Sequence, residues 1–205
     1  MEILHPASRI VSLVPSLTEA IAATRPDTLV GATDWCTHPA DLDVRRVRGT
    51  KNPDRAAIES LKPDVVLANR EENRELDVQR LREAGVTVWV TEIETVDQAF
   101  ISMTRMFVDA LGWASPDWLA RAEEVWSTPA RTTGRRVAVP IWRDPWMVVG
   151  ARTFTGDVLD RLGLVNAFGD SDDRYPHVEL GAIDRAGVDL VLLPLAAVLF
   201  LTGRR

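Results

Sequence analysis

Short apolar runs alternate with amphipathic segments along the first 94 residues. Four runs rich in Val, Ile and Leu are typical of strands buried on both faces: 9–13, 29–32, 65–68 and 86–90. Three segments with helical periodicity lie between them: 16–23, 54–61 and 75–84. Connections of this length allow crossover helices, so the alternation predicts a parallel α/β lobe.

Residues at the segment ends support these bounds. Ser16 is followed by Glu19 three residues later, which is the pattern of a capping box, so we expect a helix to begin at Ser16. Pro63 prevents the helix before it from continuing. Gly85 is a suitable stop for the segment 75–84.

Residues 95–127 differ from the segments on either side, because no strand pattern interrupts them. Apolar residues recur at three- and four-residue steps from Val96 to Leu111, on one face of a helix. Gly112 and the pair Ser115–Pro116 interrupt that pattern, and Ser before Pro suits the start of a second helix. We therefore expect a helical spacer made of two pieces, 96–111 and 116–127.

The order of elements then repeats. The first part contains RIVSLVPS…LKPDVVLA and the last part RRVAVPIW…AGVDLVLLP, each with a basic residue, a β-branched strand and a later strand preceded by Asp. In the second lobe we expect strands at 137–141, 147–149 and 188–193, the last of them buried. We expect a helix over 156–162 capped by Thr155, and a short helix over 180–186.

The predicted class is α/β, with two Rossmann-like parallel-sheet lobes joined by a long helical backbone. The sequence after residue 193 carries no turn signal for further strands or a covering helix, so we expect the second lobe to be shortened at its C-terminus. The predicted domains are an N-terminal lobe at 1–94, a helical spacer at 95–127 and a C-terminal lobe at 128–205.

Composition excludes several classes of protein. A formal net charge of −6 argues against nucleic-acid binding, which needs a basic face. The single Cys36 excludes an internal disulfide and a zinc site built from cysteines. The N-terminus has no secretory signal pattern, so the chain as written is expected to be cytoplasmic. The longest apolar run, 191–201, is too short to span a membrane.

Catalytic motifs are absent from the sequence. It contains no G-x-S-x-G elbow, no phosphate-binding loop and no G-x-G-x-x-G. His5, His38 and His177 do not share a ligand spacing. We therefore predict no catalytic residue, no metal ligand and no resident cofactor.

Aromatic residues are the strongest candidates for recognition. Seven Trp are present, and Trp35, Trp142, Trp146 and Tyr175 fall in loops or at strand ends. Ligands of open parallel sheets bind at the carboxyl ends of the strands, where flat rings suit a large, flat, partly apolar ligand. The alternative is that some of these rings pack in the core, as we expect for the Trp residues of the spacer.

The order of these segments resembles the cobalamin and iron-siderophore substrate-binding proteins of ABC importers, and most of all their cobalamin-binding branch. The resemblance covers nearly the whole chain and is carried by RIVSLVPSLTEAIAA (9–23), LVGATDWCTHP (29–39), GTKNPDRAAIESLKPDVVLA (49–68), LREAGVTVWV (81–90), GRRVAVPIW…PWMVVGARTFTGDVLDRLGLVNAF (134–168) and YPHVELGAI (175–183).

The resemblance implies a monomeric, non-enzymatic, extracytoplasmic binding protein that holds its ligand in a cleft between two lobes. It implies that Trp35, Trp142 and Tyr175 lie at or next to aromatic cleft positions, and that Thr50 stands where the cobalamin binder has a Trp. It also implies docking of surface carboxylates onto arginines of a permease, with Glu75 as the first.

The second docking position departs from the family pattern. Gly181 occupies it, and Glu179 is the nearby carboxylate. We therefore name Glu75 and Glu179 as the docking candidates, with an ABC permease as the partner if the protein is exported.

The leading hypothesis is that the chain binds a corrinoid or a related metal chelate on its aromatic residues, including Trp146. In this hypothesis Arg70, Arg143 or Thr50 contacts polar groups of the ligand. An iron-siderophore or haem receptor is an alternative, since arginines suit an anionic chelate. A cytoplasmic enzyme or cobalt-handling accessory on the same scaffold, using scattered groups such as Asp34 and His177, is another.

Overall fold

The protein is described by a computed structural model that covers residues 5–128 and 130–194. The chain divides into two compact units: unit 1 comprises Met1–Ile93 and Phe100–Arg121, and unit 2 comprises Glu94–Ala99 and Ala122–Arg205. Both helices of the predicted spacer are divided between the units, so a separate spacer domain at 95–127 stays a prediction. Within the described ranges no helix is long and apolar enough to cross a membrane.

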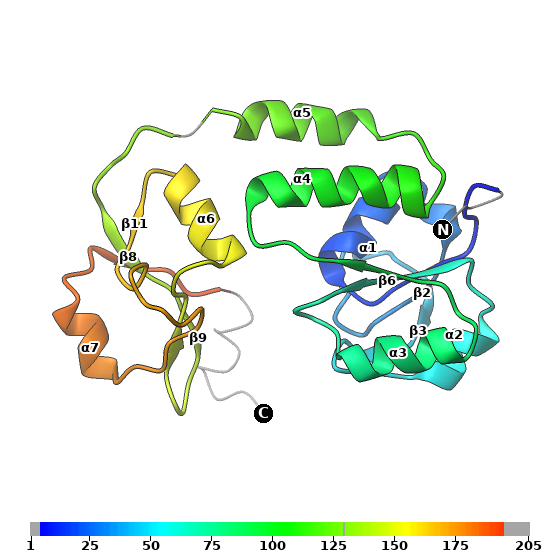
Figure 1. The fold of residues 1–205 in the computed structure, drawn as a ribbon, viewed down its shortest axis with the longest axis horizontal. Coiled ribbons are helices and arrows are strands. Elements are labelled where there is room, and N and C mark those ends of the chain that lie inside the picture. Colours follow the sequence, from blue (N-terminus) through cyan, green and yellow to red (C-terminus); the bar gives the residue numbers. More distant parts are fainter. Residues whose placement is uncertain (1–4, 129, 195–205) are drawn as a thin grey trace. The chain divides into compact units, whose positions relative to one another are not determined.

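Unit 1 contains a parallel sheet in the order β3-β2-β1-β6-β7 (Figure 1). Its strands are β1 (Ile10–Ser12), β2 (Leu29–Ala32), β3 (Arg45–Arg46), β6 (Val65–Asn69) and β7 (Val88–Thr91). Every pair in it is parallel, which confirms the predicted α/β class. A short antiparallel hairpin, β4 (Arg48–Gly49) with β5 (Asn52–Pro53), follows β3.

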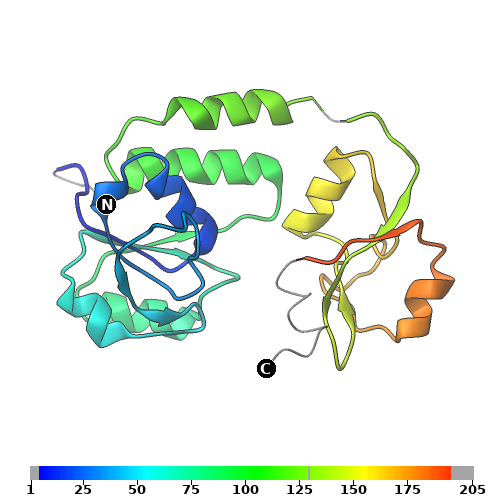
Figure 2. The same ribbon diagram turned by 180° about the vertical axis from the view of Figure 1, so that it is seen from behind.

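Helices cover both faces of this sheet (Figures 1 and 2). The helical elements of this part are α1 (Pro15–Ala22), the 3-10 turn η1 (Pro26–Thr28), α2 (Arg55–Ser60), α3 (Glu75–Glu83), α4 (Val96–Arg105), the π-helical turn η2 (Met106–Ala110) and α5 (Asp117–Trp126). Alternate residues of β1 point to opposite faces, as the period of a strand requires. Ile10 packs with α1, η2 and Trp113, whereas Val11 packs with Ile58 of α2 and Leu81 of α3.

The start of α1 differs from the expectation. The helix begins at Pro15 with Val14 as its cap residue, and no side chain caps it, so the prediction that Ser16 is the N-cap was wrong. Pro at the first helical position needs no N–H partner and has a helical φ, which explains the earlier start. The Ser16 side chain lies exposed within the first turn.

Unit 2 contains a smaller parallel sheet in the order β11-β8-β12, and a separate antiparallel pair β10-β9. The strands are β8 (Arg136–Ala138), β9 (Pro140–Trp142), β10 (Met147–Val148), β11 (Val165–Asn166) and β12 (Leu190–Val191). The helices α6 (Phe154–Arg161) and α7 (Leu180–Arg185) lie on opposite sides of β8 (Figure 1). Val137 accordingly packs with Leu159 of α6, and Ala138 with Ile183 of α7.

Three expectations for this unit were wrong. Thr153, not Thr155, caps α6, with its hydroxyl accepting a hydrogen bond from the Gly156 N–H at 3.0 Å. The strand expected at 137–141 is two strands, because Pro140 begins the antiparallel pair with β10. The strand expected to be buried at 188–193 is exposed. Leu190 and Val191 have 38% and 47% of their surface exposed to solvent, since β12 is at the edge of the described sheet.

Each unit contains the same joint, a set of hydrogen bonds between its first parallel strand and a neighbouring strand later in the chain: β1 with β6 in unit 1 and β8 with β12 in unit 2. In unit 1 the Asp64 carboxylate accepts hydrogen bonds from the N–H groups of Ser8 and Arg9 at 2.8 and 2.9 Å, and the Arg9 guanidinium donates to the Leu61 carbonyl. In unit 2 Asp189 accepts from the Arg136 N–H at 2.7 Å, and Arg136 donates to the Ala186 carbonyl.

The two joints also have the same backbone hydrogen bond. The N–H groups of Asp64 and Asp189 donate to the carbonyls of Arg9 and Arg136, both at 2.8 Å. The repeat seen in the sequence is therefore a repeat of hydrogen bonding. In unit 1 burial would raise the pKa of Asp64, but the hydrogen bonds from Ser8 and Arg9 outweigh it and hold the pKa below its ordinary value.

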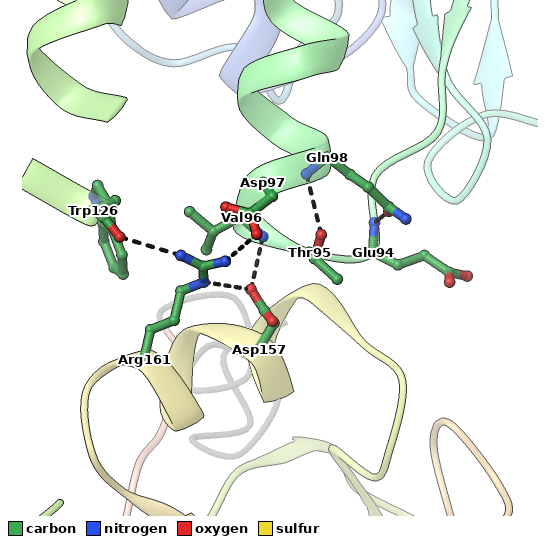
Figure 3. A network of polar contacts seen from close by, with 8 residues as sticks. All are labelled: Glu94, Thr95, Val96, Asp97, Gln98, Trp126, Asp157 and Arg161. Carbon is green, nitrogen blue, oxygen red and sulfur yellow. Dashed lines mark hydrogen bonds and ion pairs between the residues drawn. The ribbon is translucent and has the colours of Figure 1, made fainter. Parts of the chain in front are cut away.

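A polar network around Arg161 joins three segments of unit 2 (Figure 3). The Arg161 guanidinium donates to Asp97 at 2.6 Å, to Asp157 at 3.0 Å and to the Trp126 carbonyl at 3.2 Å. Asp157 also accepts from the Val96 N–H at 2.8 Å, at the first turn of α4. Burial alone would lower the pKa of Arg161, but the two carboxylates raise it, so the charge is kept.

Candidate functional site

The loops after the strands of unit 1 carry the predicted ligand residues. Trp35 follows β2 with 61% of its surface exposed. Its indole approaches the hairpin β4–β5 closely, since a Cβ added at Gly49 would lie 3.4 Å from Nε1 of Trp35. The glycine is needed for the neighbouring Asn52, because a Cβ at position 49 would come too close to Oδ1 of Asn52. Thr50 lies in the turn of that hairpin.

Asn73 fixes the hairpin to the loop that follows β6. The Asn73 amide donates to the Thr50 carbonyl at 2.9 Å, and its oxygen accepts from the Asn69 N–H at 2.9 Å. Asn69 in turn donates to the Thr91 hydroxyl at 3.1 Å. Buried polar side chains that are fully hydrogen-bonded hold loops rigidly, so this edge of unit 1 is preorganised. Asn73 is 6% exposed.

Arg70 follows β6 at the same edge, and Glu92 follows the neighbouring strand β7. The Arg70 N–H donates to the Thr91 carbonyl at 2.9 Å, which extends the ladder by one residue. The side chains of Arg70 and Glu92 form an ion pair, with 66% and 59% of their surfaces exposed. The Lys51 ammonium of the hairpin donates to the Glu71 carbonyl.

In unit 2 the predicted aromatic residues come from three neighbouring segments. Trp142 ends β9 with 44% of its surface exposed, and Trp146, half-buried, precedes β10. The chain at 176–178 pairs with β10, since the Val178 N–H donates to the Trp146 carbonyl at 2.9 Å. The half-buried Tyr175 directly precedes that segment. The structure thus brings Trp142, Trp146 and Tyr175 onto one small region of unit 2.

Arg143, also predicted as a ligand residue, lies in the turn after β9. Its guanidinium forms an ion pair with Asp144 at 3.5 Å. Arg174 lies over the Tyr175 ring, 5.8 Å from the centroid, and forms an ion pair with Glu94 at 3.1 Å. Arginines near the aromatic residues of unit 2 therefore have carboxylate partners.

A cavity of about 330 Å³ lies beside α6 in unit 2. Its lining combines polar residues such as Arg152, Asp160 and Asn166 with apolar ones such as Leu164 and Val165. None of the predicted ligand residues lines it. The cavity therefore adds no support to the aromatic site.

The two predicted docking carboxylates lie at the starts of helices. Glu75 is the first residue of α3 and is exposed. Glu179 is the exposed residue preceding α7 and does not cap it with its side chain. A Cβ added at Gly181 would lie 3.0 Å from the Arg185 guanidinium, so a longer side chain there would require Arg185 to move.

The residues considered for an enzyme are divided between the units, with Asp34 and His38 in unit 1 and His177 in unit 2. Over residues 5–128 and 130–194, no group of three His, Cys, Asp or Glu side chains could hold a metal ion. His38 and His177 are exposed, and His38 contacts the Thr37 hydroxyl at 3.1 Å. Cys36 is buried between the hydroxyls of Thr18 and Thr33.

Two residues that contact the candidate ligand residues of unit 1, Asn73 and Glu92, were not predicted from the sequence. Asn73 could have been found only from its position inside a loop that must turn sharply after a strand. Glu92 had a clearer signal, because it ends the strand next to the one that precedes Arg70. Charged residues at neighbouring strand ends are expected to meet.

Comparison with known proteins supports the resemblance. The chain is 27% identical over 187 residues to the vitamin B12-binding protein of Vibrio cholerae serotype O1, a match covering 85% of this chain and 66% of that protein. The chain thus spans less than two thirds of the length of that relative. No model of a known protein family matches.

Solved structures show the fold. The periplasmic vitamin B12 binding protein BtuF of Vibrio cholerae superposes with a TM-score of 0.73 at 22% identity, covering 97% of this chain and 80% of that one. The periplasmic heme-binding protein RhuT of Roseiflexus sp. RS-1 superposes with a TM-score of 0.78 at 21% identity, covering 96% and 80%. The chain therefore has the α/β fold of two-lobed periplasmic binding proteins, as predicted.

Proposed function

We propose that the chain is a non-enzymatic substrate-binding protein that holds a corrinoid, or a related metal chelate, for an ABC importer. The observation that carries the proposal is the pair of exposed indoles, Trp35 in the loop after β2 of unit 1 and Trp142 at the end of β9 of unit 2. The similarity to vitamin B12-binding proteins supports it. The metal would arrive inside its chelator, as cargo and not as a cofactor of the protein.

Stacking on indoles suits such a ligand physically. A corrin ring is large and flat and has apolar faces, and a Trp side chain presents up to about 250 Å² of surface. Burying about 100 Å² of each indole would contribute about 2.5 kcal/mol per residue. Trp146 and Tyr175 would extend the aromatic surface of unit 2, and Thr50, Arg70 and Arg143 would contact polar groups at the ligand's periphery.

Titration with cyanocobalamin, followed by tryptophan fluorescence and by calorimetry, tests the proposal. We expect quenching and measurable heat at micromolar ligand, and a loss of about tenfold or more in affinity for Trp35→Ala and Trp142→Ala. Trp126→Ala is the matched control, since it removes an indole outside the proposed set. Absence of both signals at high micromolar ligand excludes a corrinoid.

Haem or an iron-siderophore is the second candidate, because a structure with the same fold is described as heme-binding. Hemin and ferric chelates in the same titration separate the candidates. The rival class, an enzyme or cobalt-handling accessory, needs a titratable group at the ligand. Reduced binding or turnover in His177→Ala would support that class over a pure binding protein.

Delivery to a permease is the finer part of the proposal. We assign docking to Glu75 and Glu179, with an extracytoplasmic, monomeric protein as the resemblance implies. Charge reversal at either residue should reduce uptake without changing ligand affinity. Glu83→Lys, at the other end of α3, is the control, and equal loss of uptake in it would remove Glu75 from the docking role.

A further inference from the structure

The edge of unit 1 carries an arginine whose charge is already balanced. Arg70 and Glu92 follow β6 and β7, which are neighbours in the sheet, so both side chains project from the edge where ligands of parallel sheets bind. They form an ion pair with each other. A ligand at this edge therefore meets a pair of net charge zero and not an isolated cation.

Arg46, beside Trp35, donates to the backbone carbonyls of Thr33 and Cys36, but three other arginines near the proposed ligand residues have carboxylate partners. Arg48 of the hairpin pairs with Asp54 at 3.6 Å, Arg143 with Asp144 at 3.5 Å, and Arg174 with Glu94 at 3.1 Å. The positive charge of each of these three arginines is therefore already balanced by a protein carboxylate, and a carboxylate of the ligand would have to compete with it. An amide-bearing, neutral chelate needs no charged partner, because amides accept and donate hydrogen bonds without net charge.

We propose, resting on the proposed function, that Glu92 determines ligand charge: by pairing with Arg70 it makes the site select neutral, amide-bearing chelates over carboxylate-bearing ones. Exposed ion pairs contribute little to stability, so Glu92 is not needed for folding. The Glu92 carboxylate would still repel a negative charge on a bound ligand. Removing one of two charges about 4 Å apart in water changes the affinity roughly fivefold.

A matched pair of ligands tests this directly. Cyanocobalamin is neutral overall, and each of its monocarboxylates, in which one side-chain amide is hydrolysed, carries one added negative charge. We expect the wild-type protein to prefer the neutral form. In Glu92→Gln the affinity for at least one monocarboxylate should rise about fivefold at low salt while that for cyanocobalamin is unchanged. The gain should shrink at high salt.

A second variant predicts the opposite sign. Arg70→Gln leaves Glu92 unpaired at the edge, so the affinity for the monocarboxylate should fall about fivefold relative to that for cyanocobalamin, beyond any loss that both ligands share. The double variant should return the ratio of affinities close to that of the wild type. Circular dichroism checks that each variant is folded.

Asp109→Asn is the matched control, since it removes the same charge from another exposed Arg–carboxylate pair of unit 1. Arg105 and Asp109 lie 3.3 Å apart with 65% and 49% of their surfaces exposed. Asp109 lies in η2 and Arg105 lies over the Trp89 ring, 5.8 Å from its centroid, so this pair is outside the loops that carry the proposed ligand residues.

The outcomes separate the inference from the proposed function. Unchanged monocarboxylate affinity in Glu92→Gln, or an equal change in Asp109→Asn, overturns the role of Glu92 while corrinoid binding stands. Tighter binding of hemin than of cyanocobalamin by the wild type also overturns it. A wild type that binds no corrinoid removes the proposed function, and the inference with it.

Discussion

Units 1 and 2 use the same joint in sheets of different width. In each, an aspartate before a parallel strand accepts from the backbone at the start of the neighbouring strand, and an arginine donates to the carbonyl that ends the preceding helix. Yet β1 lies inside a five-stranded sheet, whereas β8 is the centre of a three-stranded one. The repeated Asp and Arg residues thus specify which two strands pair in each unit. The neighbouring strands and helices determine how well each sheet is buried.

The cores show the consequence of that difference. Unit 1 packs Phe107 against Trp113 and Trp118, with ring centroids 6.2 and 6.0 Å apart, over a sheet covered on both faces. The described core of unit 2 centres on smaller side chains such as Val137 and Leu159. We expect unit 1 to supply most of the stability of the chain.

Phe107→Ala should have the largest effect. Phe107 is fully buried, so the change should lower the free energy of unfolding by about 3–5 kcal/mol through lost burial and a cavity. Leu159→Ala in unit 2 should lower it by about 2–3 kcal/mol. Urea unfolding followed by circular dichroism measures both, with the exposed Val108→Ala as control. A larger effect at Leu159 contradicts the ranking of the two units.

Arg161→Met tests the polar network around Arg161 in unit 2. Arg161 is 16% exposed and removing it leaves Asp157 without its ion pair, so we expect a loss of about 2–3 kcal/mol. Arg105→Met breaks an exposed pair with the same spacing along a helix and should cost less than about 0.5 kcal/mol. Equal midpoints of unfolding for the two variants would show that the network adds no stability.

The shared joint itself should show the smallest effect. Asp64→Asn should lower the free energy of unfolding by about 1 kcal/mol at neutral pH, because charged hydrogen bonds from Ser8 and Arg9 are weakened. The pKa of Asp64 is lowered in the folded protein, so its contribution is present above the ordinary value of 3.8 and is lost as pH falls through the lowered pKa.

Unfolding of the wild type and Asp64→Asn at several pH values checks this. The difference between them should shrink as the pH falls below 3.8. Asp189→Asn is the counterpart in unit 2. A difference for Asp64→Asn that grows in acid would reverse the assigned sign.

The parallel class and the element types of unit 1 were predictable because they rest on patterns spread over many residues. Val65–Asn69 is buried at every position but the last, as its continuous apolar run indicates. Local chemistry was less decisive where two signals compete. Ser16 has the residue type of a cap, but Pro15 begins the helix first. Thr153 and Thr155 are both suitable caps for α6, and only the structure distinguishes them.

Other features depend on tertiary context. Leu190 and Val191 have a core-like pattern yet lie on an edge strand, which no local pattern reveals. The π-helical turn at Met106–Ala110 lies within an unbroken helical periodicity. Among the candidate ligand residues the sequence identified exposed aromatic rings such as Trp35. The pairing of Arg70 with Glu92 had a signal in their positions after two strands, but it depends on those strands being neighbours, which the structure shows.

The amide of Asn73 holds its neighbours through backbone atoms alone, at Thr50 and Asn69. The shape of the hairpin β4–β5 therefore does not depend on which side chain is present at position 50. A designer could install Trp there, the residue that the resemblance to cobalamin binders implies for this position, or a fluorophore-bearing cysteine, without redesigning the loop. Under the proposed function, the scaffold would then serve as a tunable optical sensor for macrocyclic chelates.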